Sequence, residues 1–315
     1  MSQRQPHLAL ELGEHAGDLA TSAEAAGFAL VTIADSPLGG ARIEAGVRAA
    51  HLARQTRRIG LAPTLHVTVT EPFHLATQLA SLDHASLGRG AWVVGAQNSA
   101  EAYATVGLPR LDGAELRREI TDVIDVARQL WDSWEDDAII RDRSTGRFLD
   151  AGKVHHVNFT GARFSVVGPL ITPRPPQGRL VVLGSDELGV TDRLDIALIA
   201  APALDEITDR TRRARADGAP LVFADLEVHP AGHSSPPRRL ADGSSPPLRH
   251  TGGADELPEL IERLGRVVDG VRLHLADPGT LPGIAAALGR PPVTGATLRD
   301  TLGLARPANR FATVA

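Results

Sequence analysis

The sequence is constrained most by a regular alternation of short apolar runs and longer amphipathic segments. Apolar runs that suit buried strands occur at residues 8–12, 29–33, 59–64, 92–94, 180–183, 197–201, 221–228 and 271–275. Segments with helical spacing lie among them, at residues 18–26, 44–56, 72–87, 115–131, 204–216 and 281–288. Strands that alternate with helices form parallel β/α units, so eight such strands in 315 residues predict a closed eight-stranded parallel β/α barrel.

We expect one β/α-barrel domain over residues 1–315, with two departures from the alternation. Residues 135–165 interrupt it, and we interpret them as an excursion of short strands or hairpins. Residues 229–252 are rich in proline, serine and arginine and contain two Ser-Ser-Pro-Pro pieces. A segment with so few apolar residues gains too little from burial to offset its ordering entropy, so a flexible loop is expected there.

Composition excludes several classes of function. A net charge of −5 and a pI near 6.2 argue against non-specific binding to nucleic acid or to anionic membranes. The chain has no cysteine, which excludes disulfides, thiol catalysis and thiolate metal sites. No apolar run reaches the ~20 residues that a membrane span needs, and residues 1–6 lack an apolar signal region. We therefore expect a cytoplasmic protein.

The longest informative stretch runs from residue 131 to residue 178. It contains WDSWEDD (131–137), GKVH (152–155), GARFSV (161–166), GPL (168–170) and PRPPQG (173–178). These pieces and their spacing resemble one branch of the bacterial luciferase-like flavin monooxygenases, which includes nitrilotriacetate, long-chain alkane and dibenzothiophene-sulfone monooxygenases. The resemblance implies the same TIM-barrel fold. It also implies a reduced insertion region, because family members carry additional helices between the seventh and eighth strands.

The resemblance implies a function as well. Such proteins are the FMN-dependent monooxygenases of two-component systems: a separate flavin reductase supplies reduced FMN, and O2 is activated as a flavin hydroperoxide. A homodimer is also expected by resemblance. In a β/α barrel the site lies at the carboxyl ends of the strands. The family's flavin contacts fall at these ends on the following residues of this chain: Asp35, Thr64, Trp92, Gln97, Gly184 and Ser185.

His66 lies two residues beyond Thr64 and is the candidate catalytic residue. A histidine at a strand end can act as a general base or proton donor near neutral pH. The alternative is that its ring fills space left by smaller neighbouring side chains.

Four positions depart from the family's flavin-binding pattern. Val93 stands where relatives have asparagine, Ala96 where they have threonine, and Ala114 where they have a tyrosine that can reach the phosphate. Asp186 replaces the second of two serines that cradle the phosphate. A carboxylate about 4 Å from a phosphate costs on the order of 4 kcal/mol per unit charge at an effective dielectric near 20. The cost disappears if Asp186 turns away and caps the helix that follows.

Two hypotheses therefore stand. The chain is a luciferase-like FMN-dependent monooxygenase, or it is a non-catalytic barrel that has lost flavin binding. In the second case it acts as a partner subunit or binds another small molecule.

Overall fold

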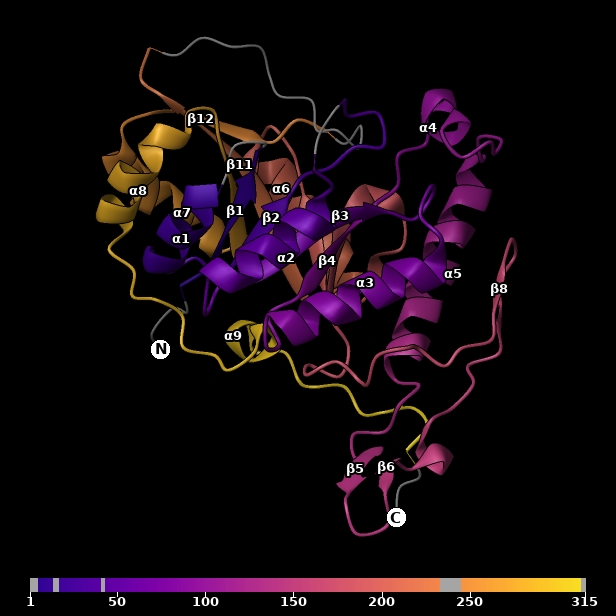
Figure 1. Cartoon of the computed structure of the whole chain (residues 1–315). Coiled ribbons are helices and arrows are strands. Elements are labelled where there is room, and N and C mark those ends of the chain that lie inside the picture. Colours follow the sequence, from indigo (N-terminus) through magenta and orange to yellow (C-terminus); the bar gives the residue numbers. More distant parts are fainter. Residues whose placement is uncertain (1–4, 14–16, 41–42, 233–244, 313–315) are drawn as a thin grey trace.

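A closed barrel of eight parallel strands forms the centre of the computed structural model, which describes residues 5–13, 17–40, 43–232 and 245–312 (Figure 1). The predicted fold is thereby confirmed. In order around the barrel the strands are β1 (His7–Leu12), β2 (Leu30–Ile33), β3 (Gly60–His66), β4 (Ala91–Gly95), β9 (Val181–Ser185), β10 (Ile196–Ile199), β11 (Leu221–Pro230) and β13 (Gly270–Leu275). The ring closes where β13 pairs with β1, at His7 opposite Gly270.

The barrel has two apolar layers because successive side chains of a strand point to opposite faces. On β9, Val181 and Leu183 belong to the cluster inside the barrel, whereas Val182 belongs to the larger cluster between the barrel and the helices. The short helix α9 (Leu298–Leu302) contributes Leu298 to the inner cluster, and its main chain bonds to Gly88 just before β4. The amino ends of the strands are therefore closed by packed apolar side chains.

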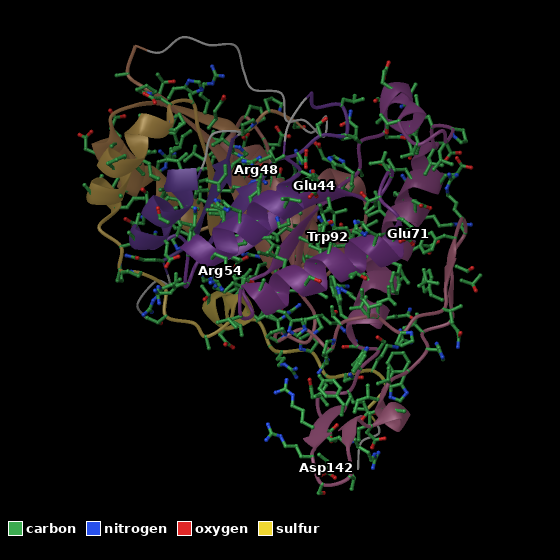
Figure 2. All side chains as sticks on the ribbon, in the orientation of Figure 1. Glu44, Arg48, Arg54, Glu71, Trp92 and Asp142 are labelled. Atoms are coloured by element: carbon green, nitrogen blue, oxygen red, sulfur yellow. The ribbon has the colours of Figure 1, made fainter. Side chains whose placement is uncertain are left out.

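Helices surround the ring where the sequence supplies amphipathic segments. They are α1 (Gly17–Ala25), α2 (Ala45–Gln55), α3 (Pro72–Ala85), α4 (Ala100–Ala104), α5 (Gly113–Trp131), α6 (Leu204–Ala216), α7 (Leu257–Gly265) and α8 (Leu281–Leu288). Glu44 and Glu71, labelled in Figure 2, accept main-chain hydrogen bonds at the starts of α2 and α3. No helix in the described residues is long and apolar enough to cross a membrane.

The connection between β9 and β10 differs from the other crossovers of the barrel. It consists of residues 186–195 and forms only two single-turn 3-10 helices, Asp186–Leu188 and Thr191–Arg193. An α-helix normally covers the barrel after each strand. Because none does so here, the neighbouring helices α5 and α6 are separated by a thin segment, and a pocket lies on each side of it.

The segment at residues 135–165, predicted to be an excursion, lies outside the β/α alternation. It contains two antiparallel hairpins, β5 (Ile139–Asp142) with β6 (Arg147–Leu149) and β7 (Phe159–Thr160) with β8 (Ser165–Val166). In Figure 1 the β5–β6 hairpin extends away from the barrel.

Both ends of the segment at residues 229–252, where a flexible loop is expected, belong to strands. His229 and Pro230 complete β11, and β12 (Leu248–Gly252) pairs with the last residues of β11 in parallel. The reason is tertiary: β10 pairs only with the first part of β11, which leaves a strand edge open to β12. Residues 233–244 of the expected loop lie outside the described residues.

Candidate functional site

Asp35 and Thr64 lie at the mouth of the barrel, as expected for strand-end residues. The Asp35 carboxylate accepts hydrogen bonds from the main-chain nitrogens of Ser36 at 2.8 Å and Ala45 at 2.6 Å. Ala45 is the first residue of α2, so the carboxylate fastens this helix to the end of β2. Thr64 follows the inward-facing Ala62 by two residues, and its side chain therefore faces the lumen.

His66 is a buried residue that ties three strand ends together. Its Nε2 lies 3.2 Å from the carbonyl oxygen of Asp35, and its Nδ1 accepts a hydrogen bond from the main-chain nitrogen of Gln97 at 3.3 Å. Both contacts are satisfied by the neutral tautomer that carries its proton on Nε2. A Cβ atom on Gly95 would lie 2.6 Å from Nδ1, so the ring fills the space that this glycine leaves. In this arrangement His66 holds the ends of β2 and β4 in place, and the lone pair on its Nδ1 already accepts a hydrogen bond.

Trp92 and Gly184 are not brought to the mouth. Trp92 is fully buried in the outer cluster, and its indole nitrogen donates to the Leu65 carbonyl oxygen at 3.1 Å. Gly184 faces the outer layer too, because a Cβ there would meet Leu194 at 3.0 Å. The pleat explains both placements: Val93 turns inward beside Trp92, and Leu183 turns inward beside Gly184. The lumen wall on β4 is consequently apolar.

Ser185 and Asp186 lie where the resemblance places the flavin phosphate. The Ser185 hydroxyl oxygen accepts a hydrogen bond from the Glu187 main-chain nitrogen at 3.2 Å and so caps the 3-10 turn. Asp186 takes no part in capping, and that hypothesis was wrong. Its two oxygens instead accept hydrogen bonds from Nε and Nη2 of Arg210 on α6, at 2.9 and 2.5 Å.

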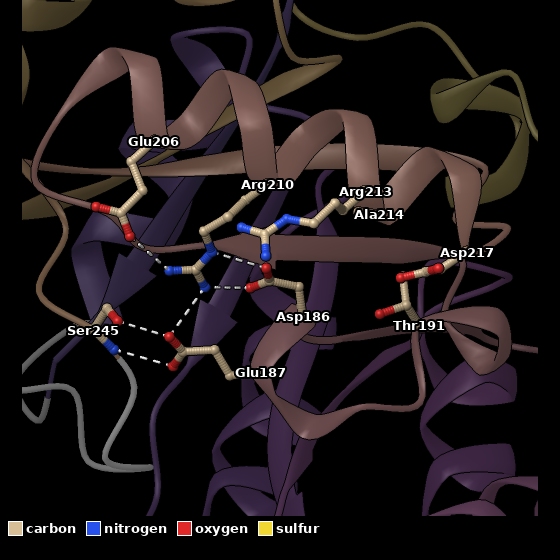
Figure 3. A pocket seen from close by; sticks show the side chains of 9 residues that line it. All are labelled: Asp186, Glu187, Thr191, Glu206, Arg210, Arg213, Ala214, Asp217 and Ser245. Carbon is tan, nitrogen blue, oxygen red and sulfur yellow. Dashed lines mark hydrogen bonds and ion pairs between the residues drawn. The ribbon is translucent and has the colours of Figure 1, made fainter.

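Arg210 is the centre of a wider ion-pair network, drawn in Figure 3. It also lies 3.2 Å from a carboxylate oxygen of Glu187 and 3.6 Å from one of Glu206, and it donates to the Ala200 carbonyl oxygen at 2.8 Å. Burial works against its charge, but the hydrogen bonds to Asp186 and the negative charges of Asp186, Glu187 and Glu206 outweigh burial, so the pKa of the guanidinium is raised. The guanidinium of Arg210 is therefore engaged by three carboxylates and a carbonyl oxygen of the protein itself.

The network lines a pocket of about 360 Å³ between α6 and the β9–β10 connection, which we call the acidic pocket. Its charged residues are four acids and two arginines: Asp186, Glu187, Glu206, Asp217, Arg210 and Arg213. The formal excess of two negative charges disfavours an anionic group at the end of β9.

A charged cluster inside the barrel was missed by the sequence reasoning. Arg272 on β13 makes two hydrogen bonds to Asp225 on β11, at 2.6 and 2.7 Å, and lies 3.6 Å from Glu11 on β1. His274, also buried, places Nε2 3.3 Å from Asp225. The available signal was the alternation of apolar with charged residues in 224–229 and 271–275, which is unusual for buried barrel strands. Within the described residues no group of three acidic or histidine side chains could hold a metal ion.

Comparisons with known proteins agree with this geometry. A solved long-chain alkane monooxygenase superposes with a TM-score of 0.82 and covers 95% of this chain and 96% of its own; at 18% identity, this likeness shows the fold. N-acetyl-S-(2-succino)cysteine monooxygenase of Bacillus subtilis is 42% identical over 139 residues, which are 44% of this chain and 32% of that protein.

The longest of these sequence matches is to a subunit of pristinamycin IIA synthase from Streptomyces pristinaespiralis. It is 33% identical over 296 residues, which are 92% of this chain and 89% of that protein. The model of the luciferase-like monooxygenase family matches residues 3–218. The chain therefore belongs to the luciferase-like monooxygenase family.

Proposed function

We propose that this chain is one half of a two-subunit luciferase-like flavin monooxygenase, and that its companion subunit holds the FMN. The observation that carries the proposal is the carboxylate of Asp186, fixed by Arg210 at the end of β9. FMN supplies the oxygen chemistry in this family, and a barrel that cannot hold its phosphate must serve another role in the assembly.

The residues at the end of β9 do not fit a flavin phosphate. Asp186 presents a negative charge, and Arg210, its ion-pair partner, is shared among three carboxylates. Val93 gives the adjacent lumen wall an apolar surface, and Ala114 has no side-chain donor for a phosphate. Each missing hydrogen bond to a charged group forfeits roughly 1.5–3 kcal/mol, in addition to the repulsion. Together these losses reduce a micromolar flavin site to a negligible one.

The companion role is supported by similarity to a protein that itself belongs to a multi-subunit enzyme. The relative matched over nearly its whole length is one of the subunits of a synthase. In such an assembly the mouth of this barrel does not contact flavin. The contacts of His66 and Asp35 keep it ordered, and the chain contributes to the complex as a structural subunit. A separate reductase supplies reduced FMN to the companion subunit.

A second candidate function is that of an FMN-dependent monooxygenase that acts as a homodimer with a flavin reductase. Asp35, Thr64 and Ser185 favour it, because they lie at the mouth where the resemblance places flavin contacts. The two candidates differ in whether this chain binds FMN by itself.

Titration with FMN in both redox states separates them. The unmodified chain is expected to show no saturable binding below about 1 mM. Asp186→Ser removes the repelling charge, restores a hydroxyl and releases Arg210 from its bidentate pair, so affinity for FMN should rise by at least about tenfold. Flavin fluorescence quenching measures oxidised FMN, and absorbance under anaerobic conditions measures the reduced form.

Asp217→Asn is the matched control for charge. It removes a carboxylate from the same pocket, but Asp217 does not contact Arg210, so its effect on affinity should be smaller. Micromolar binding of reduced FMN by the unmodified chain would overturn the proposal in favour of the second candidate. The assembly is checked by light scattering of this chain alone and after coexpression with a family member that has serine in place of Asp186. A stoichiometric complex that retains flavin is the expected result.

A further inference from the structure

A second pocket of about 360 Å³ lies on the other side of the β9–β10 connection, against α5. It is at the opposite end of the barrel from the mouth, because Arg179 precedes β9 and Arg193 precedes β10. Its charged lining consists of four arginines and two aspartates: Arg128, Arg179, Arg193, Arg310, Asp125 and Asp192. We call it the arginine pocket. Its formal excess of two positive charges contrasts with the chain's net charge of −5.

The carboxylates behind this pocket are shared between arginines. Asp195 lies 3.5 Å from Arg128 and 3.1 Å from Arg299. In the same way Asp132 serves both Arg174 and Arg179. Both aspartates within the pocket form their ion pairs with Arg193. The guanidiniums of Arg128 and Arg179 are therefore only partly neutralised by the protein.

The pKa of Arg128 reflects the positive charges that lie around it. Burial lowers the pKa of its guanidinium. The charge of Asp195 opposes this, the positive charges of Arg179 and Arg299 lower the pKa further, and Asp125 makes the smallest opposing contribution. An anion placed between these side chains would relieve the repulsion that the protein leaves in place.

Arg310 completes the pocket from the carboxyl-terminal segment. Its main-chain nitrogen donates to Asp132 at 3.3 Å, which fixes the residue beside Arg179. Its guanidinium lies 5.3 Å above the ring of Phe311 and makes no ion pair within the described part of the chain. Aromatic stacking orients an arginine without neutralising it.

We propose that the arginine pocket binds a small polyanion, a molecule with two or more ionised phosphate or carboxylate groups, at a site remote from the barrel mouth. The planar guanidiniums of Arg128, Arg179 and Arg310 suit paired hydrogen bonds to such oxygens. The volume admits a molecule larger than a single phosphate ion. This site is independent of whether the chain is a companion subunit or binds FMN.

Isothermal titration calorimetry of the full chain with inorganic pyrophosphate and with citrate, at low ionic strength, tests the site. Saturable binding of one molecule per chain is expected for at least one of the two probes. Binding of pyrophosphate alone assigns the phosphate class, and binding of citrate alone assigns the polycarboxylate class. Raising the salt to about 0.15 M should weaken binding, because the side chains are partly exposed.

Two variants weaken the site in different ways. Arg310→Gln removes an exposed cation, and Gln129→Glu adds a negative charge to the pocket wall without a change of shape. Each should weaken binding by about tenfold. Arg212→Gln is the matched control: it removes the same charge from an exposed arginine on α6 outside both pocket linings, and affinity should stay within about twofold.

Thermal unfolding of each variant confirms that the fold is kept, and Gln129→Glu, being isosteric, provides the readout if Arg310→Gln alters the terminal segment. The proposal is overturned if neither probe gives a saturable heat of binding at concentrations up to about 10 mM, because a dissociation constant above that value is too weak for a specific binding site. It is equally overturned if Arg212→Gln weakens binding as much as Arg310→Gln, because the effect would then come from net charge alone.

Discussion

The acidic pocket and the arginine pocket have the same volume, flank the same ten-residue connection and carry opposite charge. Both exist because no α-helix covers the barrel between β9 and β10. Their difference comes from the neighbouring helices. On α6, Arg210 is surrounded by Asp186, Glu187 and Glu206, whereas on α5 Arg128 shares one aspartate with another arginine. One gap in a fold thus yields a surface that repels anions and one that attracts them.

The comparison predicts that the two central arginines differ in their contribution to stability. Arg210→Met should have the largest effect, a loss of about 3–5 kcal/mol in the free energy of unfolding, because Asp186 and its neighbours would keep partly buried charges without their cation. Urea unfolding followed by circular dichroism measures this. A loss below about 1 kcal/mol would mean that the network is solvated and that Asp186 is free to move.

The framework behind the arginine pocket should show a pH dependence. Asp83 is buried and accepts hydrogen bonds from Gln177, two residues before Arg179. Burial raises the pKa of this carboxyl from 3.8 to about 6. Between about pH 4 and pH 6 the Asp83 carboxyl therefore keeps its proton in the folded state and loses it in the unfolded state. The free energy of unfolding falls by up to about 3 kcal/mol as the pH rises from 4 through 6.

Asp83→Asn isolates that contribution, because the variant has no such group to titrate. The unfolding free energy of the variant minus that of the unmodified chain should rise between pH 4 and pH 6 and then level off. Denaturant titrations at pH 4, 5, 6 and 7 give this difference. A difference that stays flat across the window contradicts the raised pKa.

The smallest effect is expected at Arg128. Arg128→Met should lower the free energy of unfolding by only about 1 kcal/mol, since Asp195 keeps its hydrogen bonds from Arg299 at 3.1 Å and from the Val182 main-chain nitrogen at 2.9 Å. The same urea measurement compares it directly with Arg210→Met. Equal losses for the two variants would contradict the proposed difference between Arg210, which is surrounded by carboxylates, and Arg128, which shares one aspartate with another arginine.

The barrel could be predicted from the sequence because its signal is local and repeated. Apolar runs at the strands and amphipathic segments between them recur through the chain, and observed elements such as β9 (Val181–Ser185) start within a residue of the expected runs. The strand β12 was missed because Leu248–Gly252 has little apolar character and forms by pairing with an exposed edge of β11. That edge is a property of the assembled sheet.

Sequence placed the candidate site at strand ends, and Asp35, Thr64, His66 and Ser185 do lie there. It gave no direction for their side chains. Trp92 turned outward with the pleat, and both ring nitrogens of His66 were engaged by main chain from two other strand ends. The charged cluster of Arg272 and Asp225 joins strands 47 residues apart, so only its alternating pattern was visible beforehand.

By itself the sequence determined the barrel and the family, because periodic burial and a long spaced motif are properties of the chain read in order. The tertiary structure decided the electrostatics. Asp186 became a fixed ion-pair partner when α6 placed Arg210 beside it, 24 residues later in the chain. Coulombic energies depend on distance and burial, and neither quantity exists until the helices have packed against the barrel.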